Sequence, residues 1–335
     1  MMRRRLSFTA PRTVEIERTD LPSPGPDELR VRTRASAISS GTELLVYRGE
    51  APERMAVDET LPALSGRLQY PLRYGYAAVG VVDDVGSGVS EERLGERVFA
   101  FNPHESHFLA KPADVLGVPD GIDDETATLL PLVETATNFL HDGTPRLGER
   151  VASFGQGTVG LLTTGVLAEF PLEQLVAIDP VEKRRRLARK LGADVALAPA
   201  ALEEQYDAES DDAGADLAFE LSGNPEALDD AINATGYDGR IVVGSWYGTK
   251  QAELDLGGEF HRNRITIESS QVSTLDPALR GRWNAERRLS TAWDLLSELD
   301  TDCLLTHREP LSNAETAYER LDEREDGVVT TILEY

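Results

Sequence analysis

One stretch, residues 149–179, constrains the fold of this chain more than any other. It opens with a short apolar run, residues 151–154, that is typical of a buried β-strand. A glycine-rich turn with the sequence GQGTVG follows at residues 155–160 and leads into an apolar segment of helical length. A second apolar run, residues 174–178, ends in Asp179. The pattern predicts a strand, a tight turn, a helix and a second, parallel strand.

The residues of the turn have separate physical roles in binding a dinucleotide. Gly155 permits the sharp change of direction from strand to helix, and Gly160 lets the helix pack closely on the strand. Gly157 has no side chain that would keep a pyrophosphate away from the backbone. Thr158 and Val159 lie in the turn, just before the helical segment expected at 161–170, whose N-terminal N–H groups and partial positive charge attract phosphates. The stretch therefore predicts a dinucleotide site; the alternative is a glycine-rich connection that binds no ligand.

Asp179 indicates which dinucleotide to expect. A carboxylate after the second strand accepts hydrogen bonds from both adenosine ribose hydroxyls and repels a 2′-phosphate. We therefore expect NAD(H) rather than NADP(H). Arg184 lies shortly after Asp179 and could stack near adenine, although an arginine in this region can also hold a 2′-phosphate.

Length and composition limit the class of protein. A chain of 335 residues has room for about two domains. It contains no apolar run near the roughly 20 residues that span a bilayer, and its basic start is not followed by the apolar run of a signal peptide. Cys303 is the only cysteine, which excludes an intrachain disulfide and a multi-cysteine zinc site. We expect a cytoplasmic protein.

The charge of the chain is strongly negative. The formal net charge is −25, and only four of the 34 basic residues are lysines. An acid-rich, lysine-poor surface keeps a protein soluble in a salty cytoplasm, so we interpret the composition as halophilic; acidity that arose by chance is the alternative. The same charge argues against nucleic acid or an anionic membrane as a partner and leaves a small-molecule substrate.

The remaining pattern predicts an α/β protein with two domains. Short β-rich segments fill residues 1–125, and helices are expected at 125–132 and 135–141. Strands and helices then alternate, which predicts a doubly wound parallel sheet over residues 126–273. The tail, residues 274–335, is expected to return to the first domain and to make that domain discontinuous.

Several segments resemble the medium-chain dehydrogenase/reductase superfamily. SerGlyThrGlu at 40–43 resembles the family's CysGlyThrAsp, residues 74–82 its GlyHisGlu strand, and residues 95–98 its GlyAspArgVal strand. The likeness runs over essentially the whole chain. It implies a GroES-like β-rich domain beside a Rossmann domain, a nicotinamide-dependent dehydrogenase or reductase, and a homodimer that pairs through the strand near 265–273.

The departures from the family are equally informative. The positions that hold catalytic zinc in many members correspond to Ser40, Tyr76 and, less securely, Pro131, none of which is a usual zinc ligand. The resemblance therefore implies a zinc-free member. Three strings resemble the branch that contains bacteriochlorophyllide hydroxyethyl dehydrogenases, without identifying a substrate: GluThrAlaThrAsn at 134–138, SerSerGlnValSer at 269–273, and ArgTrp with ArgArg within 282–288.

Without zinc, side chains or water must handle the proton of the substrate hydroxyl. Tyr76 and Ser40 are candidates because they occupy former ligand positions; Tyr76 is equally readable as a packed aromatic residue. His104 is a second candidate, with a solvated loop histidine as the alternative. Glu134 could relay a proton, or it could simply favour the start of the helix at 135–141.

The resemblance also implies further cofactor contacts. These are Thr135 near the nicotinamide, Ser222 and Gly223 near the adenosine, and Gly244 and Ser245 toward the nicotinamide. The leading hypothesis is a zinc-independent oxidoreductase that acts on a secondary alcohol or its ketone with NAD(H). The alternatives are a quinone or enoyl reductase that uses NAD(P)H and a dinucleotide-binding protein without turnover.

Overall fold

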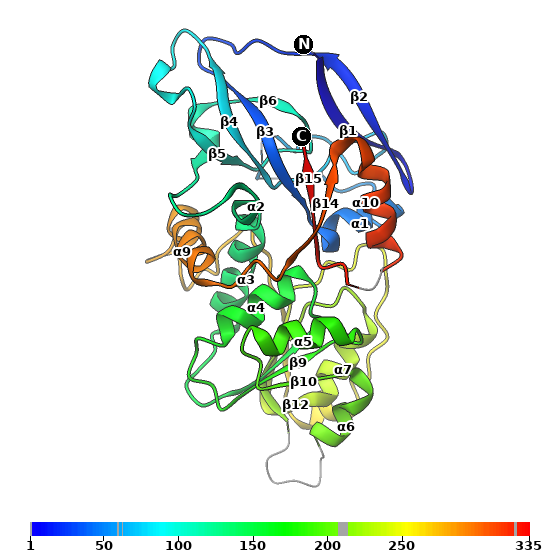
Figure 1. The fold of residues 1–335 in the computed structure, drawn as a ribbon. Helices are drawn as coiled ribbons and strands as arrows, with labels where there is room; N and C mark the ends of the chain where they lie inside the picture. The colour runs from blue at the N-terminus through cyan, green and yellow to red at the C-terminus, as the bar shows by residue number, and fades with distance from the viewer. Residues whose placement is uncertain (1, 59, 62, 207–213, 325–326) are drawn as a thin grey trace. The chain divides into compact units, whose positions relative to one another are not determined.

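The computed structural model describes residues 2–58, 60, 61, 63–206, 214–324 and 327–335. Contacts divide the chain into two compact units, which are coloured by residue number in Figure 1. Unit 1 comprises Met1–Pro131 and Leu305–Tyr335, and unit 2 comprises Leu132–Leu304. The division differs from the predicted one, because residues 274–304 belong to the unit that contains the parallel sheet.

Unit 1 is built on antiparallel strands. β1 and β2 form a hairpin, and a second sheet has the order β14-β15-β3-β4-β5-β7, with β6 also paired to β3. Figure 1 shows the last strand, in red, beside β3, in blue. Within β3 the apolar residues Leu29 and Val31 are buried and alternate with arginines, as predicted for a half-buried strand. The strands are β1 (Met2–Ala10), β2 (Thr13–Asp20), β3 (Leu29–Ile38), β4 (Ala78–Val85), β5 (Arg97–Ala100), β6 (His107–Ala110), β7 (Val115–Gly117), β14 (Leu305–Pro310) and β15 (Thr330–Glu334).

The helices of unit 1 are short. They are α1 (Ser40–Arg48), α2 (Asp124–Ala127) and α10 (Ala314–Asp322). The helix predicted at 125–132 is interrupted: α2 ends at Ala127, and the next helix begins at Leu130. In the gap the Thr128 hydroxyl donates a hydrogen bond to the Glu125 carbonyl oxygen. A hydroxyl that competes for a helical carbonyl in this way favours the end of a helix.

Unit 2 is a doubly wound sheet whose strands are all parallel. The strand order is β10-β9-β8-β11-β12-β13, so the order reverses between β8 and β11. The strands are β8 (Arg150–Phe154), β9 (Gln174–Ile178), β10 (Val195–Leu197), β11 (Ala215–Glu220), β12 (Thr235–Val243) and β13 (Thr266–Ser269). The helices are α3 (Leu130–Gly143), whose first residues precede the unit boundary, α4 (Thr158–Leu167), α5 (Glu182–Lys190), α6 (Leu202–Gln205), α7 (Glu226–Ala234), α8 (Glu259–Arg262) and α9 (Ala285–Glu298). Ligands bind such a sheet at the carboxyl ends of the strands, near the reversal.

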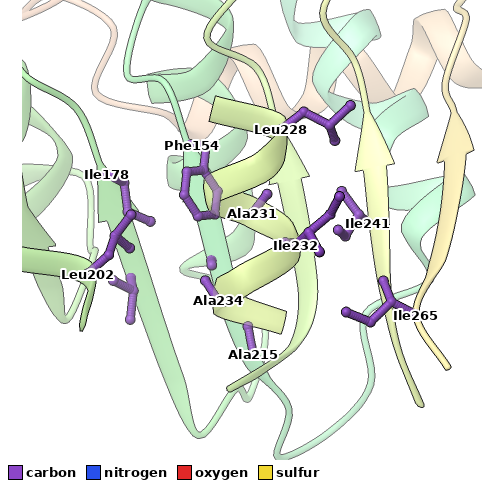
Figure 2. Close-up of a cluster of buried hydrophobic side chains, with 13 residues drawn as sticks. Phe154, Ile178, Leu202, Ala215, Leu228, Ala231, Ile232, Ala234, Ile241 and Ile265 are labelled. Atoms are coloured by element: carbon purple, nitrogen blue, oxygen red, sulfur yellow. The ribbon is translucent and has the colours of Figure 1, made fainter. Parts of the chain in front are cut away.

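One hydrophobic core cluster of unit 2 lies between α7 and the sheet. Leu228, Ala231 and Ile232 occur at helical spacing and are buried against strand residues that include Phe154 and Ile241. Figure 2 shows these side chains gathered between the helix and the strands. The alanine allows the helix backbone to approach the sheet closely, and the larger residues fill the remaining space.

Candidate functional site

The glycine turn after β8 has the geometry that the sequence predicts. Gly155 has φ +87°, and a Cβ placed on it would lie 2.4 Å from the Ser222 Cα. A Cβ on Gly160 would lie 1.9 Å from the Gly155 carbonyl oxygen. Only glycine therefore fits at either position without movement of the backbone.

Gly157 differs from the other glycines of the turn because space is open around it. It is the N-cap of α4, and a Cβ built on it meets no described atom within 4 Å. Its φ of −73° is accessible to any residue. Steric packing within the fold does not explain the glycine here, whereas a phosphate that approaches the N–H groups of α4 does.

Gln156, a residue that no sequence pattern assigned to the site, has a buried and hydrogen-bonded side chain. Its side chain is fully buried, and its Nε2 donates hydrogen bonds to the Ser153 carbonyl oxygen at 3.0 Å and to the Ser153 Oγ at 3.1 Å. Its Oε1 accepts a hydrogen bond from the Thr164 hydroxyl at 2.9 Å. The Gln156 side chain is therefore held inside the turn by hydrogen bonds at both ends of its amide. The motif alone carries no signal for this contact.

Asp179 lies directly after β9 and is connected to the same turn. Its Oδ2 accepts the Gln156 N–H at 2.7 Å, and its Oδ1 accepts the Val181 N–H at 2.8 Å. Each carboxylate oxygen has a further lone pair for a ribose hydroxyl. The Arg184 Nη1 lies 3.9 Å from the Asp179 Oδ2, so the arginine is within ion-pair distance of the acid.

Four more of the predicted cofactor residues lie at the carboxyl ends of β11 and β12. Ser245 Oγ accepts the Gly223 N–H at 2.8 Å, and the Gly244 N–H donates to the Glu220 carbonyl oxygen at 3.0 Å. Ser222 donates to the Glu220 carboxylate through both its N–H and its hydroxyl. Glu220 is fully buried and was not assigned from the sequence. An acidic residue directly after the apolar run at residues 217–219 is the signal that could have revealed it.

A polar cluster in unit 1 contains Tyr76. The Tyr76 hydroxyl donates to the Ser39 Oγ at 2.5 Å. Burial raises the pKa of Tyr76 to about 12, although hydrogen bonds with the Ser39 and Thr42 hydroxyls oppose the rise. Tyr76 is therefore a neutral hydrogen-bond donor at physiological pH. Ser40 is the first residue of α1 and is half-buried.

His104 is not a solvated loop residue, as one interpretation of the sequence held. Its side chain is fully buried, its Nε2 lies 2.9 Å from the Glu43 Oε2, and its Nδ1 lies 2.7 Å from the Ser36 Oγ. Glu43 is also fully buried and accepts hydrogen bonds from the Ser39 N–H at 2.7 Å and from the Tyr318 hydroxyl. These partners satisfy the hydrogen-bonding capacity of a carboxylate that is shielded from water.

The chain is similar in sequence and fold to known dehydrogenases. A sequence model for the family described as zinc-binding dehydrogenase matches residues 158–296. D-guloside 3-dehydrogenase of Escherichia coli (strain K12) is 24% identical over 314 residues, which cover 90% of each chain. A short chain alcohol dehydrogenase (rspB) of E. coli CFT073, solved with NADH, superimposes with a TM-score of 0.80 at 20% identity, covering 100% of this chain and 99% of the other.

A Sinorhizobium meliloti 1021 protein solved with NADP has a TM-score of 0.78 at 18% identity and full coverage of both chains. The chain belongs to the medium-chain dehydrogenase/reductase superfamily. The predicted combination of a Rossmann sheet and a GroES-like β-rich domain is confirmed. The finer resemblance to the bacteriochlorophyllide hydroxyethyl dehydrogenase branch stays a prediction.

Members of this superfamily described as zinc-binding raise the question of a metal. The positions that the resemblance assigns to zinc ligands carry the hydroxyls of Ser40 and Tyr76 and the proline Pro131, not the thiolates, imidazoles or carboxylates that zinc prefers. Within the described residues no group of three or more His, Cys, Asp and Glu side chains could hold a metal ion. The ring nitrogens of His104 are both occupied by protein partners. These side chains do not fit a catalytic zinc.

Glu134 lies within α3 and not at its start, because the helix begins at Leu130. The helix-start explanation is therefore wrong. Its Oε1 accepts a hydrogen bond from the Arg288 Nε at 3.0 Å. Burial raises the pKa of Glu134 above its ordinary value, and the charge and hydrogen bond of Arg288 offset part of this rise. Thr135, the next residue, is half-buried. The role of Glu134 in moving a proton stays a prediction.

Proposed function

We propose that the chain is a zinc-independent dehydrogenase that transfers a hydride between NAD(H) and a secondary alcohol or the corresponding ketone. One observation carries the proposal: the Asp179 carboxylate is bound by the N–H of Gln156, directly beside the open position of Gly157. The glycine turn is open to a pyrophosphate, and it is hydrogen-bonded to the acid that would accept the ribose hydroxyls. The membership of the chain in a dehydrogenase superfamily supports the same activity.

The residues of unit 2 fit the parts of the cofactor. Gly157 and the N-terminal N–H groups of α4 would hold the pyrophosphate. Asp179 would accept the ribose hydroxyls, and its negative charge makes a 2′-phosphate unfavourable there. The Arg184 Nη1 lies 3.9 Å from the Asp179 Oδ2, within ion-pair distance of this acid. Ser245 and Gly244, at the end of β12, would approach the nicotinamide half. The bound nicotinamide supplies or accepts the hydride.

The substrate oxygen needs a hydrogen-bond donor, and we assign this role to Tyr76. Its hydroxyl is neutral because burial raises its pKa to about 12. The single Tyr76 proton points to Ser39 Oγ in this structure, so the Ser39 hydroxyl would rotate to become the donor to Tyr76. The Tyr76 hydroxyl could then donate a hydrogen bond to a carbonyl oxygen as negative charge develops on it. The Ser39 and Thr42 hydroxyls surround the same oxygen of Tyr76 and would stabilise any negative charge on it.

The experiment is a fluorescence titration with NADH and NADPH, in molar salt, on the wild type and on Asp179→Ala. We expect the wild type to prefer NADH and the variant to lose the preference. Tighter binding of NADPH would make Arg184 a phosphate ligand and favour the quinone or enoyl reductase alternative. Binding of neither cofactor would contradict the proposal.

Turnover then separates the remaining alternatives. A panel of secondary alcohols and ketones, beside one of quinones and enones, identifies the bond that is reduced. NADH binding without turnover on either panel would favour the non-catalytic alternative. Turnover that survives dialysis against a chelator, with zinc well below one per chain, is expected of a metal-independent enzyme; loss of turnover that zinc restores would contradict it.

We also propose that the protein acts as a cytoplasmic homodimer. β13 is the outermost strand of its sheet in the part of the chain that the structure describes, and Thr266, Glu268 and Ser269 are exposed. An exposed edge strand offers backbone groups for pairing with a second copy. Light scattering should give twice the chain mass, and Ile267→Pro, which removes an edge N–H, should shift the measured mass toward that of the monomer.

For the described residues, no helix is long and apolar enough to cross a membrane.

A further inference from the structure

A buried arginine on α9 connects segments that are far apart in the sequence. The Arg288 side chain is 4% exposed. Its Nε and Nη2 lie 3.0 and 2.9 Å from the Glu134 Oε1, and its Nη1 donates to the Asn138 Oδ1 at 2.6 Å. Its Nη2 also donates to the Val272 carbonyl oxygen at 2.5 Å. One guanidinium therefore fixes two positions on α3 and the backbone that follows β13.

The hydrogen bonds continue from Asn138 to the end of the sheet. The Asn138 Nδ2 donates to the Ser270 Oγ at 3.0 Å and to the Asp142 Oδ2 at 2.9 Å. The Ser270 Oγ in turn donates to the same Asp142 oxygen at 2.5 Å, and the Ser270 N–H donates to the Val243 carbonyl oxygen at 3.0 Å. Ser270 is the first residue after β13, so this network sets the conformation of the chain at the carboxyl end of that strand.

The position of the network in the sheet points to one half of the cofactor. In a doubly wound sheet each half binds one nucleotide of a dinucleotide, at the carboxyl ends of its strands. The half formed by β8, β9 and β10 contains the glycine turn and Asp179, which suit the adenosine and the phosphates. The half formed by β11, β12 and β13 is left for the nicotinamide nucleotide. Arg288 is hydrogen-bonded to the segment that ends this second half.

Stability alone does not account for such a residue. A buried ion pair contributes little net stability compared with apolar residues of the same volume, whereas a guanidinium fixes geometry through its rigid fork of donors. Arg288 uses that fork on a carboxylate, a side-chain amide and a backbone carbonyl.

We propose that Arg288 is a positioning residue for the nicotinamide half of the cofactor. It holds the residues after β13 and the segment of α3 around Thr135 in a fixed arrangement, without touching the adenosine half. The inference rests on the proposed function, because it requires a dinucleotide in the sheet of unit 2.

Arg240 offers a matched control in the same unit. Its Nη1 and Nη2 donate to the two carboxylate oxygens of Glu149, each at 2.8 Å, and its Nε donates to the Gly143 carbonyl oxygen at 2.7 Å. Arg240 pairs with Thr266, the first residue of β13, and Glu149 precedes β8, so this ion pair lies at the amino ends of the strands. It is a partly buried ion pair of the same kind at the end of the sheet opposite the predicted cofactor.

The test compares ADP-ribose, which lacks nicotinamide, with NADH by isothermal titration calorimetry on the wild type, Arg288→Met and Arg240→Met. For Arg288→Met we expect NADH to bind about tenfold more weakly, as for the loss of charged hydrogen bonds, while the Kd of ADP-ribose changes less than about twofold. The nicotinamide fluorescence of bound NADH should also lose its enhancement. Arg240→Met should lower the melting temperature and leave the ratio of the two Kd values unchanged.

Equal weakening of both ligands, or no change in either, would show that Arg288 has only a structural role. If Arg288→Met does not fold, Asn138→Ala keeps the pair between Glu134 and Arg288 but removes the link to Ser270, and it should change the same ratio in the same direction. An unchanged ratio in Asn138→Ala would overturn the inference. A wild type that binds neither ligand would instead overturn the proposed function, whereas a wild type that binds both keeps the two questions separate.

Discussion

The Cβ position of Gly160 lies 1.9 Å from the carbonyl oxygen of Gly155, so the first turn of α4 rests directly on the backbone of the glycine turn. No side chain fits between these residues. The contact sets the direction of α4 and thereby aims its N-terminal N–H groups past Gly157. Two glycines of the same motif therefore do different work: Gly160 is required by packing, and Gly157 leaves space for a ligand.

This difference predicts opposite phenotypes for the two alanine variants. Gly160→Ala forces a methyl group into backbone atoms and should lower the free energy of unfolding by about 3 kcal/mol, as overpacking does. Gly157→Ala should change it by less than about 1 kcal/mol, because the position is open and its φ suits alanine. It should nevertheless weaken NADH binding by tenfold or more, which corresponds to about 1.4 kcal/mol. Denaturant unfolding and NADH titration measure the two effects, and stable, cofactor-competent Gly160→Ala protein would contradict the packing argument.

Tyr76→Phe tests the assigned hydrogen-bond donor. The variant keeps the ring and removes the hydroxyl, so kcat should fall by about 100-fold, the order seen when one donor to a developing oxyanion is lost. NADH affinity should be unchanged. Tyr70→Phe is the matched control, because the Tyr70 hydroxyl donates to the Val46 carbonyl oxygen in the same unit. If both variants lose kcat equally, the effect comes from altered packing and the assignment fails.

The raised pKa of Tyr76 also predicts a pH dependence. Burial moves the pKa from 10.0 in the unfolded chain to about 12 in the folded protein. A raised pKa means that the folded state holds this proton more tightly, so its contribution to stability is complete below about pH 10 and is lost as the pH rises toward 12. The free energy of unfolding should therefore decline in this window, and less steeply in Tyr76→Phe. A tyrosine absorbance titration should show no ionisation of this group near pH 10; an ordinary pKa would refute the buried donor.

Glu43→Gln tests the buried cluster of unit 1. The Glu43 Oε2 faces the His104 Nε2 and the Tyr318 hydroxyl. In the glutamine variant an amide N–H in this position would face these two groups in place of an accepting oxygen. We expect a loss of about 2 kcal/mol in the free energy of unfolding, as when a buried hydrogen-bonding group loses its partner. The exposed Glu53→Gln makes the same chemical change and should have little effect. Equal stability of the two variants would show that the cluster contributes nothing.

The net charge of −25 predicts that salt stabilises the protein. Repulsion among exposed carboxylates is screened as the Debye length falls from about 10 Å at 0.1 M to about 3 Å at 1 M salt. The melting temperature should rise by several degrees between 0.1 M and 2 M KCl. Sucrose, which does not screen charge, is the control for general stabilisation by a cosolute. A melting temperature that falls or stays constant in KCl would contradict the halophilic interpretation.

Local patterns in the sequence determined most of the proposed cofactor site. The apolar run before Gly155, the spacing of the glycines and the acid at Asp179 lie within one continuous stretch, and the structure forms β8, α4 and β9 there. These features depend on the conformation of neighbouring residues, which the local sequence largely sets. The same holds for the alternation of strands and helices that predicted a parallel sheet.

Only the tertiary structure decided the surroundings of the candidate catalytic residues. His104 meets Glu43 across 61 positions of sequence, and Arg288 meets Glu134 across 154. No periodicity connects such pairs, because a partner's identity depends on which faces of distant elements are buried together. A histidine between polar neighbours resembles a loop residue until packing shows it to be fully buried. The sequence therefore specified the glycine turn and the acid that we propose hold a dinucleotide, and tertiary packing specified which polar side chains are buried and paired.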